Sequence, residues 1–183
     1  MEIPSAQKLD ETRKKGFRPG VVGCFINDKE VLLFLKKEFN LWTLPQGGVL
    51  NKAKLTPRMA KETLVKSLEK KMSEEVGSEF FKTCNNNYEL VGEDLVEFPP
   101  ERHNVLDLFT DTGKKVEMIG KVYYFFVINS PQRDLQVSKT PYDDCFWMSY
   151  KPALFLANKI HQPGKRRILV NCLNLLKEKG FVE

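Results

Sequence analysis

The sequence predicts an α/β protein of the α+β type, with a mixed β-sheet sandwiched between helices. Three observations predict this class: an apolar hairpin opens the folded part, a long amphipathic helix follows it, and several strands come before two terminal helices. Because the strands alternate poorly with the helices, the order does not fit a doubly wound parallel sheet. A mixed sheet packed between helices fits it better.

The chain begins with a polar N-terminal extension, residues 1–16, which contains a short possible helix. Val21–Ile26 and Val31–Lys36 are apolar and rich in β-branched residues, and the intervening "NDKE" is typical of a tight turn. The two runs therefore predict a hairpin. The extended "LWTLP" follows, and Gly47 and Gly48 are then expected to break regular structure.

A long helix is predicted next. Thr56 is a suitable N-cap, and Pro57 suits the first helical position. Apolar residues then recur at every fourth position from Ala60 to Val76, which predicts one buried stripe on a helix of about five turns. Gly77 is expected to end this helix.

The second half of the chain predicts further strands and then two helices. The strands are Tyr88–Phe98, the strongly apolar Lys121–Ile128 and the short "CFWMSY"; the helices begin near Pro152 and cover about Lys165–Lys179. Residues 101–115 are polar and rich in turn formers. Because no long linker interrupts residues 17–183, they are expected to form a single domain.

The composition of the 183 residues is that of a soluble globular protein, with 42% hydrophobic and 29% charged residues. No run approaches twenty apolar residues, so no membrane span is expected. The N-terminus has no apolar signal region, and the four cysteines have no metal-binding spacing. Free thiols fit a reducing compartment, so we expect a cytoplasmic location.

The positive charge is local. The formal net charge is +5, and the segment from Asn51 to Lys71 alone has seven basic residues against two acidic ones. A local basic field favours anionic ligands. The simpler interpretation is a solvated helix face.

The end of the predicted helix, "KKMSEEVG" (Lys70–Gly77), resembles the second half of the Nudix box of the Nudix hydrolases. That box runs Gly, five residues, Glu, seven residues, Arg-Glu, an aliphatic residue, any residue, Glu-Glu, any residue and Gly. "FRPGVVGCFI" and "WTLPQGGV" are similar to the segments that lead into the box in RNA 5′-pyrophosphohydrolases and dinucleoside polyphosphate hydrolases, and "YDDCFWMSY" is similar to their closing region. The resemblance implies a Nudix-like mixed sheet between helices over about Phe17–Lys179.

The box is degenerate. The family's Arg-Glu pair falls on Lys70 and Lys71, and its first Glu, counted back from the end of the box, falls on Glu62. Thirteen residues separate Gly48 from Glu62 where the family has five. We therefore expect an insertion near residues 49–61.

The resemblance implies a set of site residues. Glu74 and Glu75 are the candidate catalytic residues. Mg or Mn would be held by Gly48, Glu74, Glu75 and Asp144, with Asp143 as an alternative to Asp144. The candidate substrate-binding residues are Arg18, Lys36, Gln46, Lys70 and Lys71.

Each of these assignments has an ordinary structural alternative. Two glutamates near a helix end are commonly surface residues, and Asp143 and Asp144 suit an ordinary turn. Lys71 replaces a carboxylate one helical turn before Glu74. Its charge would oppose Mg²⁺ by roughly 4 kcal/mol at about 4 Å and an effective dielectric constant near 20.

Two functions follow from the resemblance. One is a Nudix-like hydrolase of a nucleoside-diphosphate-linked substrate, meaning a dinucleotide, a nucleotide or an RNA 5′ end, with activity reduced by the degenerate box. The alternative is a catalytically inactive Nudix-fold module that binds nucleotide or RNA through a basic surface. A protein partner that docks on the inserted segment, residues 51–61, is a third hypothesis.

Overall fold

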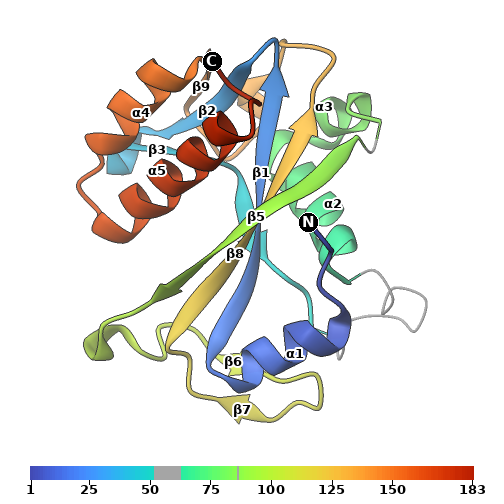
Figure 1. Cartoon of the computed structure of the whole chain (residues 1–183), viewed down its shortest axis with the longest axis vertical. Helices are drawn as coiled ribbons and strands as arrows, with labels where there is room; N and C mark the ends of the chain where they lie inside the picture. The colour runs from blue at the N-terminus through green and yellow to red at the C-terminus, as the bar shows by residue number, and fades with distance from the viewer. Residues whose placement is uncertain (52–62, 86) are drawn as a thin grey trace.

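The computed structural model describes residues 1–51, 63–85 and 87–183 (Figure 1). A mixed β-sheet lies between two layers of helices. Helices α4 and α5 cover one face, and α1, α2 and α3 pack on the other, so each face has its own hydrophobic core. The prediction of an α+β protein with a mixed sheet between helices is confirmed.

The helices are α1 (Ala6–Lys14), α2 (Thr63–Val76), α3 (Ser78–Thr83), α4 (Tyr150–Asn158) and α5 (Pro163–Glu178). The strands are β1 (Phe17–Asn27), β2 (Glu30–Lys36), β3 (Leu41–Thr43), β4 (Gln46–Gly48), β5 (Tyr88–Glu97), β6 (Leu108–Phe109), β7 (Lys115–Val116), β8 (Gly120–Asn129) and β9 (Asp144–Met148). Short 3₁₀ turns are η1 (Lys37–Phe39), η4 (Pro100–Arg102) and η5 (Val137–Lys139).

The main sheet has the order β3-β2-β1-β8-β5, with β4 also paired to β1 and β9 to β2. Strands β1 and β8 run parallel, from the pair Phe17–Gly120 to the pair Ile26–Asn129. The other pairings in this sheet are antiparallel. Strand β8, the most apolar run of the sequence, is therefore central and buried on both faces.

The predicted hairpin is confirmed. Strands β1 and β2 pair as Ile26–Val31 and Asn27–Glu30, and Asp28 and Lys29 form the turn. Both turn residues have positive φ, 45° and 65°, which is the geometry of a type I′ turn. This turn matches the twist of the two strands and fixes their register.

The expectation that Gly47 and Gly48 break regular structure is wrong. Both lie in β4, which pairs with β1 as Gly20–Gly48 and Val21–Gly47. Successive residues of a strand point to opposite faces. A Cβ on Gly47 would lie 2.2 Å from Cδ of Lys71, and one on Gly48 would lie 2.8 Å from Nη2 of Arg18. The glycines therefore make room for basic side chains rather than end a strand.

The buried stripe of α2 is confirmed from Leu64 to Val76: Leu64, Leu68, Met72 and Val76 are at most 2% exposed. Met72 packs on strand β1, where a Cβ on Gly23 would be 2.2 Å from its sulfur. The expected N-cap Thr56, Pro57 and the first apolar position Ala60 lie outside the described residues. The same holds for Glu62 and for most of the expected insertion.

The N-terminal extension contains a packed helix. Leu9 of α1 is fully buried and Arg13 is 2% exposed. The Arg13 guanidinium donates to Oδ1 of Asp111 and to the carbonyl of Leu50, both at 3.0 Å. Helix α1 therefore shares the core of α2 and α3, while the division into an extension and one domain stays a prediction.

Three cysteines, Cys24, Cys84 and Cys172, are buried, and Cys145 is half-buried. Among the described residues, none of the helices has the length and apolar character that a membrane span needs. The cytoplasmic location stays a prediction.

The packing of Met72 yields a stability prediction. Met72→Ala should lower the free energy of unfolding by about 2–5 kcal/mol, because it leaves a cavity between α2 and β1. Denaturant titration measures the change. Lys70→Ala, at an exposed position of the same helix, is the control and should change stability by at most about 0.5 kcal/mol. Equal effects of the two substitutions would contradict the packing described for α2.

Candidate functional site

Glu74 is engaged by the two lysines that precede it on α2. Nζ of Lys71 lies 2.6 Å from one of its carboxylate oxygens, and Nζ of Lys70 lies 3.8 Å from the other. The hydrogen bond from Lys71 lowers the pKa of Glu74. The carboxylate is thus charged but already faces two cations of its own helix.

The carboxylate of Glu75 accepts a hydrogen bond from a residue that is distant in the sequence. The hydroxyl of Tyr142 donates to its Oε2. Tyr142 is 7% exposed and its ring centroid lies 4.6 Å from that of Phe34. Burial, helped by the charge of Glu75, raises the pKa of Tyr142, so the phenol stays a donor. Nζ of Lys36 lies 5.1 Å from the centre of the same ring.

The described residues bring no further metal ligand to Glu74 and Glu75. Hard divalent cations take carboxylate and carbonyl oxygens from several groups. No three Asp, Glu, His or Cys residues come together at a metal-binding spacing in the described ranges. Asp143 instead accepts a hydrogen bond from the backbone N–H of Lys37 at 2.7 Å, and Asp144 accepts one from the N–H of Cys145 at 2.9 Å. The predicted metal set of Gly48, Glu74, Glu75 and Asp144 stays a prediction.

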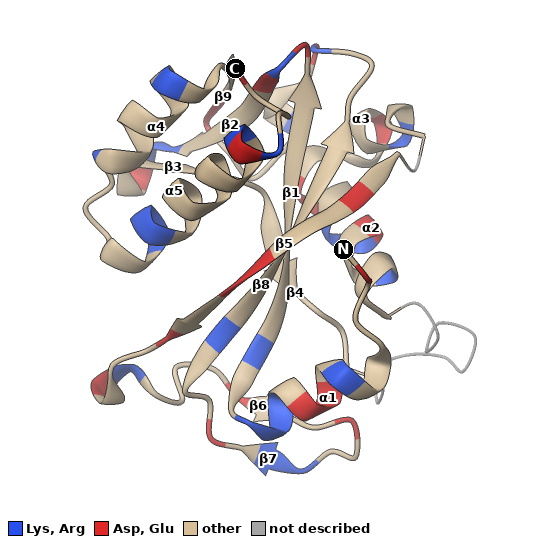
Figure 2. Ribbon diagram, in the orientation of Figure 1, with Lys and Arg blue, Asp and Glu red and all other residues tan. Residues whose placement is uncertain are grey.

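Positive charge gathers instead where β1, β4 and β8 reach the first turn of α5. Arg18 of β1 and Lys121 of β8 are partners in the parallel ladder, and Figure 2 shows basic bands side by side on these strands. With Lys165 of α5 they face a cavity of about 200 Å³, which we call the cationic pocket. Its lining residues are Arg18, Pro19, Gly20, Gln46, Gly47, Gly48, Lys121, Tyr123 and Lys165.

No carboxylate is among the lining residues of the cationic pocket. Burial, together with the charges of Lys165, Arg18 and Arg102, lowers the pKa of Lys121 to about 8. Burial and the charge of Lys36 likewise lower the pKa of Lys165. Half-buried positive charges that repel one another oppose folding, and such arrangements are concentrated at functional sites.

Tyr123 adds a neutral donor to this pocket. Burial raises its pKa to about 12, so its hydroxyl keeps its proton at neutral pH. Nζ of Lys121 lies 6.0 Å from the centre of the Tyr123 ring. The ring thus partly covers the lysine, and the lining combines cations with a phenol and the amide of Gln46.

A second cavity of about 210 Å³ adjoins the first and shares Arg18 and Gly48 with it. Lys71 lines this second cavity, as do Leu108, Phe109 and Asn51. Oδ1 of Asn51 is buried and has no hydrogen-bond partner in the described structure. Lys71 therefore lines the cavity next to the cationic pocket, while its amino group is bound to Glu74.

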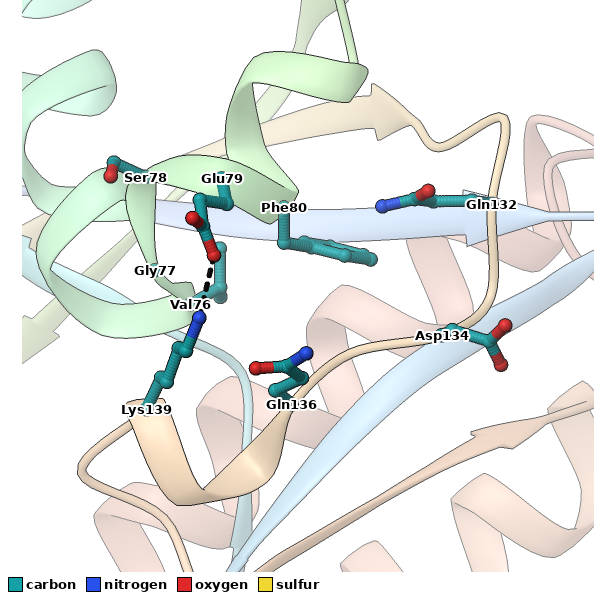
Figure 3. Close-up of a pocket in the computed structure, with 9 residues that line it drawn as sticks. All are labelled: Val76, Gly77, Ser78, Glu79, Phe80, Gln132, Asp134, Gln136 and Lys139. Atoms are coloured by element: carbon teal, nitrogen blue, oxygen red, sulfur yellow. Dashed lines mark hydrogen bonds and ion pairs between the residues drawn. The ribbon is translucent and has the colours of Figure 1, made fainter.

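A larger cavity, about 470 Å³, lies at the junction of α2 and α3 (Figure 3). It is lined by Val76, Gly77, Ser78, Glu79, Phe80, Gln132, Asp134, Gln136 and Lys139. Its lysine is neutralised, because Nζ of Lys139 lies 2.7 Å from Oε2 of Glu79. None of the predicted site residues lines it, so size alone does not identify the functional site.

Comparison with known proteins finds no family model that matches the chain and no match among curated proteins. Solved structures do match. The MutT protein from Methanosarcina mazei Go1 is 17% identical with a TM-score of 0.53, over 89% of this chain and 95% of that one. The E. coli dihydroneopterin triphosphate pyrophosphohydrolase is 12% identical with a TM-score of 0.52, over 86% and 97%. The NUDIX domain of Shewanella oneidensis NrtR, solved with ADP ribose, is 14% identical with a TM-score of 0.50, over 89% and 88%.

The protein has the Nudix fold. On this fold most of the predicted site residues fall into three groups. Arg18, Gln46 and Gly48 meet in the cationic pocket. Lys70, Lys71 and Glu74 form a local charge cluster on α2, and Lys36 and Glu75 meet at Tyr142.

Sequence reasoning missed Lys121, Tyr123 and Lys165. A signal was present for the first of these, because Lys121 is a lone charge at the start of the apolar run "VYYFFVI". Lys165 begins a series of basic residues, "KRR", at the start of the last helix, where positive charge opposes the helix dipole. Only the fold brings both beside Arg18.

The electrostatics of the cationic pocket predict that Lys121→Met stabilises the protein. At pH 7 the free energy of unfolding should rise by about 1–2 kcal/mol, because the substitution removes a half-buried charge next to other cations. The folded-state pKa, about 8, lies below the ordinary 10.5, so the unfolded chain holds more protons between these values. The penalty is therefore complete below about pH 8 and disappears by about pH 10.5.

Denaturant titrations of both proteins between pH 6 and roughly pH 10.5 measure this difference. Lys151→Met, at an exposed position of α4, is the control and should change stability by at most about 0.5 kcal/mol at any pH. A destabilised Lys121→Met protein at pH 7 would contradict the description of the pocket.

Proposed function

We propose that this protein is a Nudix-fold module that binds a phosphate-bearing ligand, a nucleotide or an RNA 5′ end, in the cationic pocket without a divalent metal. One observation carries this proposal. Arg18, Lys121 and Lys165 line one cavity, and no carboxylate is among the lining residues. A phosphate group would supply the missing negative charge.

The pocket has the groups that phosphate recognition uses. A guanidinium can donate two parallel hydrogen bonds to phosphate oxygens, and ammonium groups act as compact charges. The first turn of α5, which contains Lys165, adds the positive end of a helix dipole. Tyr123 and Gln46 offer further hydrogen bonds to oxygen atoms of the ligand.

The charge pattern of α2 supports binding without a metal. In the register of the resemblance, Lys71 stands where the family has a metal-binding carboxylate. Lys71 and Lys70 both form ion pairs with Glu74. Where the family neutralises phosphates with a cation from solution, this chain would do so with its own lysines and arginine. The match to a domain solved with ADP ribose supports a ligand of nucleotide size.

Calorimetry with inorganic pyrophosphate and with ATP, in buffer that contains EDTA, tests this proposal. We expect binding that weakens as salt concentration rises, because phosphate contacts are electrostatic. It should also weaken above about pH 8, where Lys121 loses its proton. Arg18→Met and Lys121→Met should each weaken it at least about tenfold, since a charge-assisted hydrogen bond contributes about 1.5–3 kcal/mol.

Lys82→Met, at an exposed position of α3, is the matched control for these substitutions and should bind as the unaltered protein does. Binding that EDTA abolishes and salt leaves unchanged would contradict the proposal. So would equal affinities of the Lys121→Met and Lys82→Met proteins.

The Nudix fold also suggests a second function, pyrophosphohydrolase activity on nucleoside-diphosphate-linked substrates. Among the similar structures, the E. coli protein is named a pyrophosphohydrolase. In this chain Lys71 would lower the activity, because it places a cation where the family has a carboxylate. Equal phosphate release by the unaltered protein and by a Glu74→Gln/Glu75→Gln variant, with Mn²⁺ and a panel of such substrates, would exclude this second function.

Lys71→Glu tests the register of the box. The substitution changes the local charge by −2 and puts a third carboxylate one helical turn before Glu74 and Glu75. We expect Mn²⁺ to bind more tightly in calorimetry and any turnover to rise.

Lys70→Glu is the matched control for this experiment, with the same change of charge at the neighbouring position. If both variants gain the same Mn²⁺ affinity, the effect is one of charge alone. If Lys71→Glu gains none, the register is wrong, and Glu74 and Glu75 are no longer candidate metal ligands. Docking of a protein partner on residues 51–61 stays a prediction, because residues 52–61 lie outside the described ranges.

A further inference from the structure

The amino group of Lys121 is placed unusually for a lysine. It lines a cavity, so small molecules can reach it, yet it is half-buried and lies among other cations. Arg18 is beside it in the sheet, Lys165 faces it from α5, and Arg102 of η4 adds to the positive field. No carboxylate shares this lining, whereas Lys71 and Lys139 each contact a glutamate.

We propose that Lys121 is a site of acylation by acyl phosphates, and that this modification turns off anion binding in the cationic pocket. The inference rests on the proposed function, because the groups that would bind a ligand's phosphate would also hold the phosphate of the acylating molecule. Arg18 and Lys165 bind that phosphate, and the acyl carbon then lies beside the amine of Lys121.

The chemistry balances without a further reactant. The lone pair of the neutral Lys121 amine attacks the carbonyl carbon of the acyl phosphate. The bond between that carbon and the bridging oxygen breaks, inorganic phosphate leaves, and the nitrogen releases its proton to solvent. The product is an amide on Lys121, and Arg18 and Lys165 stabilise the negative charge on the departing phosphate.

The pocket favours the reactive form of this lysine. With a pKa of about 8, about a fifth of Lys121 is neutral at pH 7.4, against about one molecule in a thousand for an ordinary lysine. A less basic amine is also a weaker nucleophile, which reduces this advantage to about tenfold if amines follow the dependence known for thiols. Holding the phosphate in the pocket adds the effect of proximity.

Acylation would change the pocket in two ways. It removes one of three positive charges, which weakens the attraction for phosphate. It also places an acyl group in a cavity of only about 200 Å³. The modified protein should therefore bind pyrophosphate at least about tenfold more weakly, as expected for loss of one charge-assisted contact.

The experiment incubates the full chain with acetyl phosphate and follows each lysine by peptide mass spectrometry. Lys121 should be acetylated at least about fivefold faster than the exposed Lys151, and its rate should level off above about pH 8. Pyrophosphate should slow the reaction at the pocket lysines, Lys121 and Lys165, but not at Lys151. Arg18→Met, checked for folding by circular dichroism, should slow acetylation by acetyl phosphate much more than acetylation by an uncharged acetyl ester.

The inference is overturned if Lys121 reacts no faster than Lys151, or if Arg18→Met slows both reagents equally. It is also overturned if the acetylated protein binds pyrophosphate as the unmodified protein does. Calorimetry of the unmodified protein with pyrophosphate tests the proposed function separately. Binding without preferential acetylation would reject the modification site alone, and absence of binding would reject the proposed function.

Discussion

The parallel pairing of β1 with β8 is the constraint on which the candidate site depends. It fixes Arg18 opposite Lys121, on the face that α5 covers. Like charges at neighbouring positions of a sheet repel each other, so this pair works against the sheet that contains it. The apolar remainder of both strands holds the register, because a slip by one residue would expose the side chains of two cores. The apolar packing of the sheet thus places Arg18 beside Lys121, although this pair of like charges does not stabilise the sheet.

Strand β4 connects the two faces of this scaffold. Its two glycines point to opposite sides, so that the stem of Lys71 lies over Gly47 and the guanidinium of Arg18 lies over Gly48. A side chain at either position would displace a cation. Helix α2 and the cationic pocket therefore meet at a two-residue segment, even though they lie on opposite faces of the sheet. This explains why two adjacent glycines occur inside a strand, where each would otherwise lower stability.

Patterns that depend on near neighbours were predicted well from the sequence. The hairpin turn at Asp28 and Lys29, the stripe of α2 and the apolar strand β8 all follow from periodicity over a few residues. Strand β4 was missed because its glycines have no strand propensity of their own, and only pairing with β1 makes it a strand. The contact of Tyr142 with Glu75 joins residues 67 positions apart, and no local pattern signals it. The cationic pocket was not predicted for the same reason, since Arg18, Lys121 and Lys165 come from three distant segments.

The two groups of charges in this molecule differ in how they are balanced. On α2, Lys70 and Lys71 lie against Glu74. The side chains of Lys70 and Glu74 are exposed, and ion pairs at such positions contribute little to stability. In the cationic pocket the charges are half-buried, and no carboxylate lines the cavity with them. Water screens the first group, but it screens the second less well because fewer water molecules reach it. A cation that approaches Glu74 would first have to displace lysines, whereas an anion in the pocket would meet no carboxylate among the lining residues. These local charges support the proposed binding of phosphate at the pocket.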